Sequence, residues 1–244
     1  MQAQQRQQQL RQQVRQQRQL LSLAQREQAG AQVAERLQAL AEFQQATMIA
    51  SYASFGAELP TCTIHQQLAA PKRLALPVLH PVLAHQLLFL EITEATVWQQ
   101  NRYGINEPEL RVERIVPLSQ LQIMLLPLVG FDRSGQRLGM GGGYYDRTLA
   151  AYHGGQLPQL LTIGLGYDFQ QLEALPQQPW DVPLQLVITP SKVWDFRRLT
   201  ATLAGHSFAT RKSAWPPLTC TLTKSKHRPH KPLSNTFKKV KLLA

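Results

Sequence analysis

The chain has only two cysteines, Cys62 and Cys220, and they do not stand in a metal-binding or redox spacing. This scarcity is typical of a protein of a reducing compartment. No run of 18 apolar residues occurs, so the sequence predicts no membrane-spanning helix. The Gln- and Arg-rich N-terminus has no apolar segment of the kind found in secretory signals. We therefore expect a cytoplasmic protein with no membrane partner.

The familiar patterns of nucleophilic and zinc catalysis are also missing. No residues form an arrangement typical of a Ser-His-Asp or Cys-His nucleophile, and there is no HExxH motif. The seven histidines are scattered and none has the spacing of metal ligands. The sequence therefore argues against zinc-assisted hydrolysis and shows no covalent nucleophile.

Acidic residues are absent from residue 197 to the end, where 11 of the 26 Lys and Arg residues lie. Because the chain has 15 Asp and Glu, residues 1–196 carry no formal net charge, and the tail supplies the whole excess of +11. The tail has no sustained apolar period and is rich in Thr, Ser, Lys and Pro, so it buries too little to offset chain entropy. We predict a single domain over 1–196 and a disordered basic tail over 197–244. The alternative is a weak tether to RNA or to a membrane surface.

The N-terminal region predicts helices. Leu10, Val14 and Leu21 recur at near-helical spacing, and a break is expected between Ser22 and Arg26. A clearer amphipathic helix follows, with apolar residues three to four positions apart at Val33, Leu37, Leu40 and Phe43.

Short apolar runs then alternate with polar or helical segments. Strands are expected over 47–52, 74–79, 87–92, 121–126, 161–165 and 184–189. Helices are expected over 63–69 and 144–152. This alternation predicts an α/β domain: a three-layer sandwich with a largely parallel central sheet, preceded in the sequence by the N-terminal helices.

The most informative segment is LPLVGFDRSGQRLGMGGGYYD, residues 126–146. An apolar run leads into a turn with Asp132 and Arg137, and four glycines then fall within the five positions 139–143. Glycines let backbone amides approach a bulky anion, and the amides of such a turn before a helix form a phosphate cradle. Arg137 supplies a cation for phosphate oxygens, and Asp146 is placed to reach a metal ion on them. A structural turn is the simpler alternative, and the spacing matches neither a P-loop nor a dinucleotide fingerprint.

Four other features fit around this loop, each with an ordinary structural alternative. Arg11 and Arg15 share one helix face and can grip outer phosphates, or merely face solvent. Glu58 lies after an expected strand and before an expected helix. Its structural alternative is a carboxylate that the positive end of the helix dipole stabilises. Asp181 precedes a buried strand and is either a second carboxylate that faces a cation or a turn residue. Trp98 either offers an aromatic face for stacking or belongs to the core.

The segment FDRSGQRLGMGGGYYDRTL resembles the signature of 5-formyltetrahydrofolate cyclo-ligases, also called methenyltetrahydrofolate synthetases. The resemblance continues, in the expected order, through YASFGAELPT, YGINEP, IGLGYDFQ and WDVPLQLVIT, and covers residues 8–195. It implies an ATP-dependent closure of 5-formyltetrahydrofolate to 5,10-methenyltetrahydrofolate that releases ADP and phosphate, with Mg²⁺ as cofactor. We expect a monomer, and no nucleic-acid binding except weakly through the basic tail. The alternatives are another nucleotide- or sugar-phosphate-binding α/β enzyme, and a non-catalytic RNA-associated protein that uses the basic tail.

The resemblance also implies roles for individual residues. The family's N-terminal basic pattern falls on Arg11, Gln12, Gln13, Val14 and Arg15, with Arg in place of Lys and Val in place of Leu. Its ATP loop falls on Arg137, Leu138, Gly139, Met140, Gly141, Gly142, Gly143, Tyr144 and Tyr145.

Arg137 is the expected catalytic cation, and 140–144 also border the folate. The folate contacts Ala53 and Glu58, and the magnesium carboxylates are Asp146 and Asp181. Many members carry a further Asp where this chain has Gln185, a position we interpret as structural.

Overall fold

The computed structural model describes residues 2–150, 157–176, 178 and 180–198. The chain divides into two units, Met1–Thr210 and Arg211–Ala244, and every described residue lies in the first. The predicted disordered tail falls outside the described residues except for Arg197 and Arg198, so it stays a prediction. Within the described part of the chain, no helix is long and apolar enough to cross a membrane.

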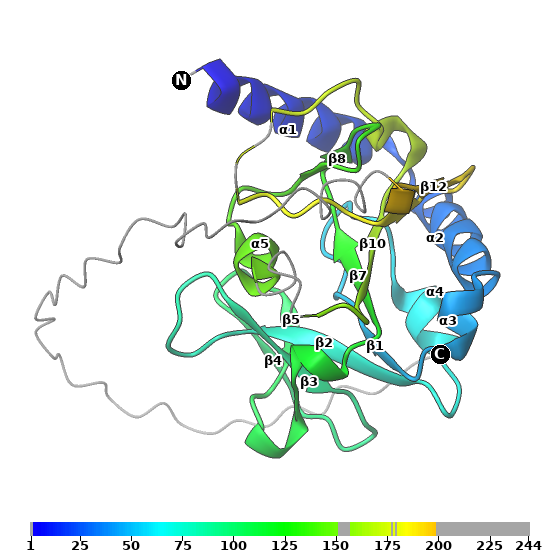
Figure 1. The fold of residues 1–244 in the computed structure, drawn as a ribbon, viewed down its shortest axis with the longest axis vertical. Coiled ribbons are helices and arrows are strands. Elements are labelled where there is room, and N and C mark those ends of the chain that lie inside the picture. Colours follow the sequence, from blue (N-terminus) through cyan, green and yellow to red (C-terminus); the bar gives the residue numbers. More distant parts are fainter. Residues whose placement is uncertain (1, 151–156, 177, 179, 199–244) are drawn as a thin grey trace, which may run out of the picture. The chain divides into compact units, whose positions relative to one another are not determined.

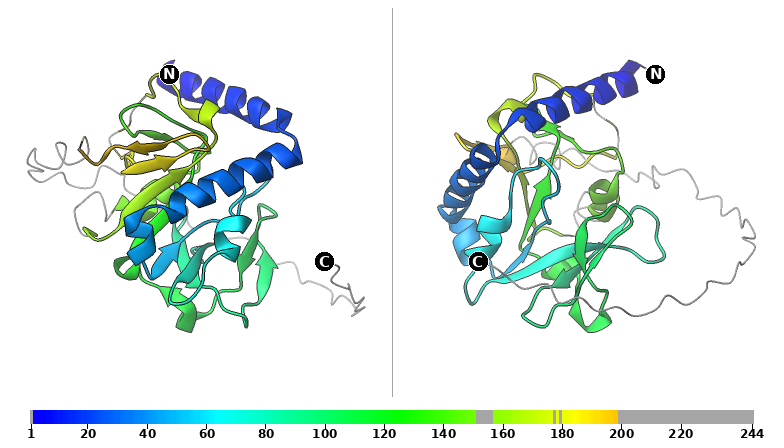
Figure 2. Two further views of the ribbon diagram at one scale, coloured as in Figure 1. Left: turned by 90° about the vertical axis from the view of Figure 1, so that its right-hand side faces the viewer. Right: turned by 180° about the vertical axis from the view of Figure 1, so that it is seen from behind.

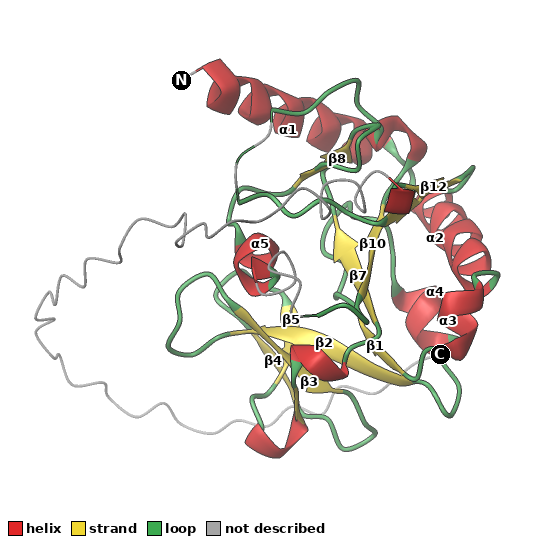
Figure 3. Ribbon diagram, viewed as in Figure 1, coloured by secondary structure: helices red, strands yellow, loops and turns green. Residues whose placement is uncertain are grey.

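A sheet of eight strands forms the centre of the domain (Figures 1 and 3), in the order β12-β11-β10-β7-β1-β2-β3-β6. Parallel pairing joins its five middle strands, β11 to β2. The edge strands β12 and β6 pair antiparallel with their neighbours, and so do β2 and β3. The bounds are β1 Met48–Ala50, β2 Arg73–Leu79, β3 Leu87–Glu91, β6 Ile115–Val116, β7 Ile123–Pro127, β10 Leu161–Leu165, β11 Leu186–Ile188 and β12 Val193–Asp195. The predicted largely parallel sheet is confirmed.

Alternate residues of these strands pack into two apolar cores, one on each face of the sheet. In β7, Ile123 and Leu125 belong to one core, and Met124 and Leu126 to the other. Helices α2 (Leu23–Gln38), α3 (Ala41–Gln45) and α4 (Cys62–Gln66) cover the first face, while α5 (Tyr144–Thr148) lies on the opposite side (Figure 1). A strand buried on both faces reads as a continuous apolar run, which is why these segments were recognisable in the sequence.

Two long helices meet at a bend before the sheet begins (Figure 2): α1 Gln2–Leu20 and α2 Leu23–Gln38. Ser22 ends the first and caps the second, because its hydroxyl accepts from the amide of Gln25 while the Gln25 side chain accepts from the Ser22 amide. The break predicted between Ser22 and Arg26 is confirmed at Ser22, although Leu23–Arg26 already belong to α2.

The predicted continuous helix through Phe43 is wrong. Leu40 adopts an extended conformation and separates α2 from the short helix α3, Ala41–Gln45. This kink turns Phe43, which is fully buried, into the same core as Leu37.

Smaller elements complete the fold. Helix α4 covers Cys62–Gln66, and α5 covers Tyr144–Thr148. The continuous helix predicted over 144–152 is wrong, because α5 ends at its C-cap Leu149; residues 151 and 152 lie outside the described residues. Two hairpins stand apart from the main sheet, β4 Trp98–Gln100 with β5 Asn106–Pro108, and β8 Gly130–Phe131 with β9 Arg137–Leu138. Three single turns of 3₁₀ helix are η1 Val112–Arg114, η2 Leu118–Gln120 and η3 Asp168–Gln170.

Candidate active site

The glycine loop, residues 139–143, follows the carboxyl end of β7, after the β8–β9 hairpin and directly before α5. This is the edge of a parallel sheet at which ligands bind in open α/β folds. Asp132 fixes the hairpin: its Oδ1 accepts from the amides of Ser134 (2.9 Å) and Gln136 (3.1 Å), and its Oδ2 from the amide of Leu175 (3.0 Å). The loop therefore starts from a rigid base.

Each glycine of the loop makes room for a neighbouring side chain. A Cβ atom at any of these positions would approach an arginine or a tyrosine: 3.2 Å from Arg137 at Gly139, 3.6 Å from Arg11 at Gly141, 2.9 Å from Tyr144 at Gly142 and 2.5 Å from Arg147 at Gly143. Gly141 and Gly143 also have positive φ angles, +98° and +65°. At Gly139, Gly142 and Gly143 the missing Cβ thus lets two guanidinium groups and an aromatic ring pack against the backbone, while at Gly141 the positive φ is what favours glycine.

Helix α1 lies against this loop. The Nε of Arg11 donates to the carbonyl oxygen of Gly139 at 2.8 Å, and Nη2 of Arg15 lies 3.7 Å from the sulfur of Met140. Val14 is buried in a small apolar cluster beneath the helix, and holds it in place. The structure therefore brings the predicted arginine pair to the predicted phosphate loop.

The other residues that the resemblance assigns to ATP binding differ in their exposure to solvent. Gln12 and Gln13 are exposed on α1, while Leu138 is buried beneath the loop and Met140 is exposed on it.

Arg137 and Asp146 form an ion pair at the base of the loop. Nη2 of Arg137 donates to Oδ1 of Asp146 at 2.6 Å, and the two side chains are 5% and 19% exposed. The Arg137 guanidinium also lies over the ring of Tyr145, 5.7 Å from its centre, and its Nε is buried without a hydrogen-bond acceptor. The predicted catalytic cation and one predicted metal ligand thus contact each other.

Asp181 approaches the same group from the segment that leads to β11. Its Oδ2 accepts from the amide of Gln178 at 2.9 Å. Burial raises the pKa of Asp181, and the nearby charge of Asp146 raises it further, while Arg137 and Arg11 act against this. Three charged side chains from distant parts of the sequence therefore lie near enough to Asp181 to affect its pKa: Arg11, Arg137 and Asp146. Among the described residues, no three His, Cys, Asp or Glu side chains cluster as metal ligands would.

Glu58 lies in the loop between β1 and α4, together with Ala53. Its Oε2 accepts from the amide of Phe55 at 3.0 Å. Burial raises the pKa of Glu58, and this hydrogen bond and the charge of Arg18 oppose the rise. Its carboxylate in turn adds to the rise in the pKa of Tyr145, for which burial is the main cause. Glu58 is therefore close to the second tyrosine of the glycine-loop motif.

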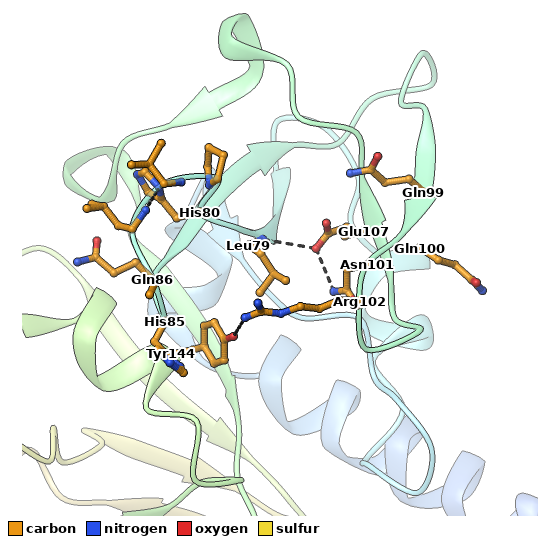
Figure 4. Close-up of a pocket in the computed structure, with 14 residues that line it drawn as sticks. Leu79, His80, His85, Gln86, Gln99, Gln100, Asn101, Arg102, Glu107 and Tyr144 are labelled. Atoms are coloured by element: carbon orange, nitrogen blue, oxygen red, sulfur yellow. Dashed lines mark hydrogen bonds between the residues drawn. The ribbon is translucent and has the colours of Figure 1, made fainter. Parts of the chain in front are cut away.

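A cavity of about 460 Å³ lies beside Tyr144, between the β2–β3 loop and the β4–β5 hairpin (Figure 4). The Tyr144 hydroxyl accepts from Nη2 of Arg102 at 2.7 Å and lies 2.8 Å from the hydroxyl of Tyr103. Figure 4 shows Glu107 at its inner wall, where Oε2 accepts from the side-chain amide of Asn101 at 3.0 Å. The cavity has a mixed polar and apolar lining, and Tyr144 places it next to the glycine loop.

Three contributions to this site were not predicted. Arg18 is buried on α1 and donates to the carbonyl oxygen of Leu128, although an arginine on a polar helix reads as a solvated residue. Arg102 and Tyr103 reach Tyr144 from a hairpin whose YGINEP segment was noted, but its fold was not. Arg147 donates to the carbonyl oxygen of Gly142 at 2.9 Å. Trp98, by contrast, is half-exposed on β4 and lies outside the core.

Gln185 has a structural place, as expected. Its Oε1 accepts from the amide of Thr162 at 3.0 Å, and its own amide donates to the Thr162 hydroxyl at 3.2 Å. It therefore connects the start of β10 to the residues before β11.

The sequence profile of the 5-formyltetrahydrofolate cyclo-ligase family matches residues 3–190. The cyclo-ligase of Escherichia coli strain K12 is 44% identical over 184 residues, which is 75% of this chain and 100% of that protein. The one from Haemophilus influenzae is 45% identical over 178 residues, covering 72% of this chain and 94% of that protein.

Solved structures agree with these relatives. The methenyltetrahydrofolate synthetase of Aquifex aeolicus matches with a TM-score of 0.65 at 28% identity, over 78% of this chain and 93% of that one. The Mycoplasma pneumoniae synthetase matches with a TM-score of 0.59 at 26% identity, over 75% and 98%. These similarities do not favour the RNA-associated or the looser nucleotide-enzyme alternative. The chain belongs to the 5-formyltetrahydrofolate cyclo-ligase family.

Proposed function

We propose that this family member performs the family's reaction at the glycine loop, using ATP and Mg²⁺. The reaction converts 5-formyltetrahydrofolate to 5,10-methenyltetrahydrofolate and releases ADP and phosphate. One observation carries the assignment: oppositely charged residues from α1, the β8–β9 hairpin, α5 and the segment before β11 converge on a loop whose backbone is open to an anion.

The backbone polarity of the loop supports a phosphate site. Within the described residues, none of the four amide groups of residues 140–143 donates a hydrogen bond to a protein acceptor. The carbonyl oxygens of Gly139 and Gly142, in contrast, each accept from an arginine. Consecutive amides without acceptors form a concavity that binds anions. The loop alone supports this, since α5 is too short for its dipole to matter.

The carboxylates fit a magnesium ion that is partly held by a nucleotide. Mg²⁺ takes one or two protein carboxylates and completes its shell with phosphate oxygens and water. Asp146 and Asp181 are near enough for the charge of one to raise the pKa of the other, and no third acid stands with them among the described residues. We therefore assign these two residues to the ion, which would neutralise phosphate charge when bound.

Glu58 and the two tyrosines are assigned to the folate. Tyr145 lies close to Glu58, and the adjacent Tyr144 lines the cavity of Figure 4. A folate that lies along the two tyrosines would reach both Glu58 and the cavity. Ala53 lies in the same loop as Glu58. Flat aromatic faces with hydroxyl groups suit a ring system that carries polar edges.

The chemistry needs alignment rather than a protein nucleophile. Transfer of the γ-phosphoryl group to the formyl oxygen forms an iminium phosphate and releases ADP. The N10 amine then attacks the formyl carbon and loses its proton, and phosphate leaves with the former formyl oxygen. Arg137 and the loop amides stabilise charge on the transferring group, while Arg11 holds the loop in position.

The test follows the conjugated methenyl product by absorbance and ADP release in the same reaction. Product should form only with both ATP and Mg²⁺, in equal amount to ADP. Glu58→Gln should raise KM for folate roughly tenfold, the value of one charged hydrogen bond, and change kcat little. The exposed Glu94 is the matched control, and Glu94→Gln should behave as wild type. Product without ATP, or ADP release that ignores the folate, would refute the proposal.

We also propose that the enzyme works as a cytoplasmic monomer. The two cysteines without a redox spacing and the self-contained charge cluster of one chain support this. Sedimentation of the full chain at assay concentration would test the monomer.

A further inference from the structure

Arg147 is a charged residue of the site to which neither the sequence analysis nor the proposed chemistry assigns a role. It follows Asp146 in α5, and its Nη1 donates to the carbonyl oxygen of Gly142 at 2.9 Å. Its backbone amide donates to the carbonyl oxygen of Gly143 at 3.1 Å. One residue therefore binds two successive carbonyl groups of the glycine loop.

The glycine at position 143 is what allows this contact. A Cβ there would lie 2.5 Å from Nη1 of Arg147 and 3.4 Å from its Cζ, so any side chain would displace the guanidinium. The residue has φ +65° and ψ 20°, a left-handed conformation that glycine adopts without strain. The conformation of Gly143 and the position of Arg147 therefore depend on each other.

Peptide geometry connects this contact to the anion site. In a planar trans peptide the carbonyl of Gly142 and the amide N–H of Gly143 point in opposite directions. Because Arg147 binds the carbonyl oxygen of Gly142, the N–H of Gly143 points away from the Arg147 guanidinium. This N–H is one of the loop amides that have no acceptor among the described residues. At the other end of the loop, Arg11 does the same to the peptide between Gly139 and Met140.

We propose that Arg147 is a positioning residue for nucleotide binding, which fixes the Gly142–Gly143 peptide so that its amide donates to a phosphate oxygen. It acts through the backbone and not as a phosphate ligand. The inference rests on the proposed function, because it takes the loop as the phosphate site.

The test uses Arg147→Met and Arg147→Lys in the full chain. Arg147→Met should raise KM for ATP and the Kd for ADP on the order of tenfold, the value of one well-placed hydrogen bond, and leave KM for folate unchanged. kcat at saturating ATP should fall less than threefold. Arg147→Lys retains a donor for the carbonyl and should recover most of the affinity. Arg133 is exposed on the hairpin turn, and Arg133→Met is the matched control.

A spectroscopic measurement separates positioning from a general loss of structure. With ¹⁵N-labelled glycine, the spectrum of the nucleotide-free chain should show Arg147→Met shifting the amides of Gly142 and Gly143, with those of Gly30 and Gly164 unchanged. An Arg147→Met variant that binds ADP within twofold of wild type would overturn the inference. So would an equal rise in KM for folate, or Lys no better than Met. If wild type binds no ADP, the proposed function fails first, so the two failures are distinguishable.

Discussion

The ion pair between Arg137 and Asp146 gives a quantitative prediction about stability. Nη2 of Arg137 and Oδ1 of Asp146 are 2.6 Å apart and both side chains are largely buried, so Arg137→Met leaves a carboxylate with little water and without its paired cation. Breaking a fully buried pair costs about 3–5 kcal/mol, and an exposed pair is worth under about 1 kcal/mol. Because Asp146 is 19% exposed, we expect a loss of about 2–3 kcal/mol.

For a domain of this size, each kcal/mol lowers Tm by roughly 2–4 °C, so the expected decrease is about 4–12 °C. Calorimetry without nucleotide measures it. Asp146→Asn should also destabilise, since it leaves the buried Arg137 guanidinium without its partner. The double variant Arg137→Met/Asp146→Asn should be more stable than the sum of the single changes predicts, by about 1–2 kcal/mol.

Additive single changes, or a Tm of Arg137→Met within 2 °C of wild type, would refute the reasoning. In that case the pair would be an exposed contact with no energetic weight. Activity gives the second measurement: Arg137→Met should lower kcat on the order of 10²–10³, as the loss of a transition-state donor does. The Arg133→Met variant controls for charge in both experiments.

Three further outcomes are expected. Asp181→Asn should weaken ATP binding in Mg²⁺ but not in EDTA, and unchanged affinity in a titration would remove Asp181 from the ion site. Burial lowers the pKa of His65 to about 4 from an unfolded value of 6.5. The unfolded chain therefore takes up that proton first, so the free energy of unfolding should fall between pH 6.5 and pH 4 by up to about 3 kcal/mol. His65→Asn should flatten that part of the urea-unfolding profile, and an identical profile would contradict the assignment. Ending the chain after Arg198, which keeps the contacts of Arg197 with Asp195 and Glu42, should leave Tm within 2 °C; a larger decrease would show that the tail packs on the domain.

The sequence predicted those parts of the fold that depend on local apolar pattern. The middle strands were found because each is an apolar run of a length that suits a buried strand, and β10 was predicted at Leu161–Leu165 as observed. The edge strands β6 and β12 have two and three residues, too few for a period to show. The break at Leu40 was missed because the kink between α2 and the short helix α3 preserves the apolar spacing across it.

The same contrast holds for the site. The arginine, glycines and carboxylates of the loop were identified because they are adjacent in sequence. Arg18 and Arg147 were not, because their role depends on which carbonyl group each one reaches after folding, and the residue type alone does not encode that. The pairing of Arg137 with Asp146 was likewise invisible, although both residues were assigned to the site separately.

Helix α1 is attached to the domain by little apolar surface. Only Leu10 and Val14 of its 19 residues enter a buried cluster, with Val129, Leu138 and Leu175. Segments with few buried contacts open locally at a lower free energy than the global unfolding transition. The arginines that meet the glycine loop therefore lie on a helix with few buried apolar contacts, which we expect to open locally before the domain unfolds. Under the proposed function, a nucleotide phosphate bound between helix and loop would close that opening and slow the amide exchange of the whole helix.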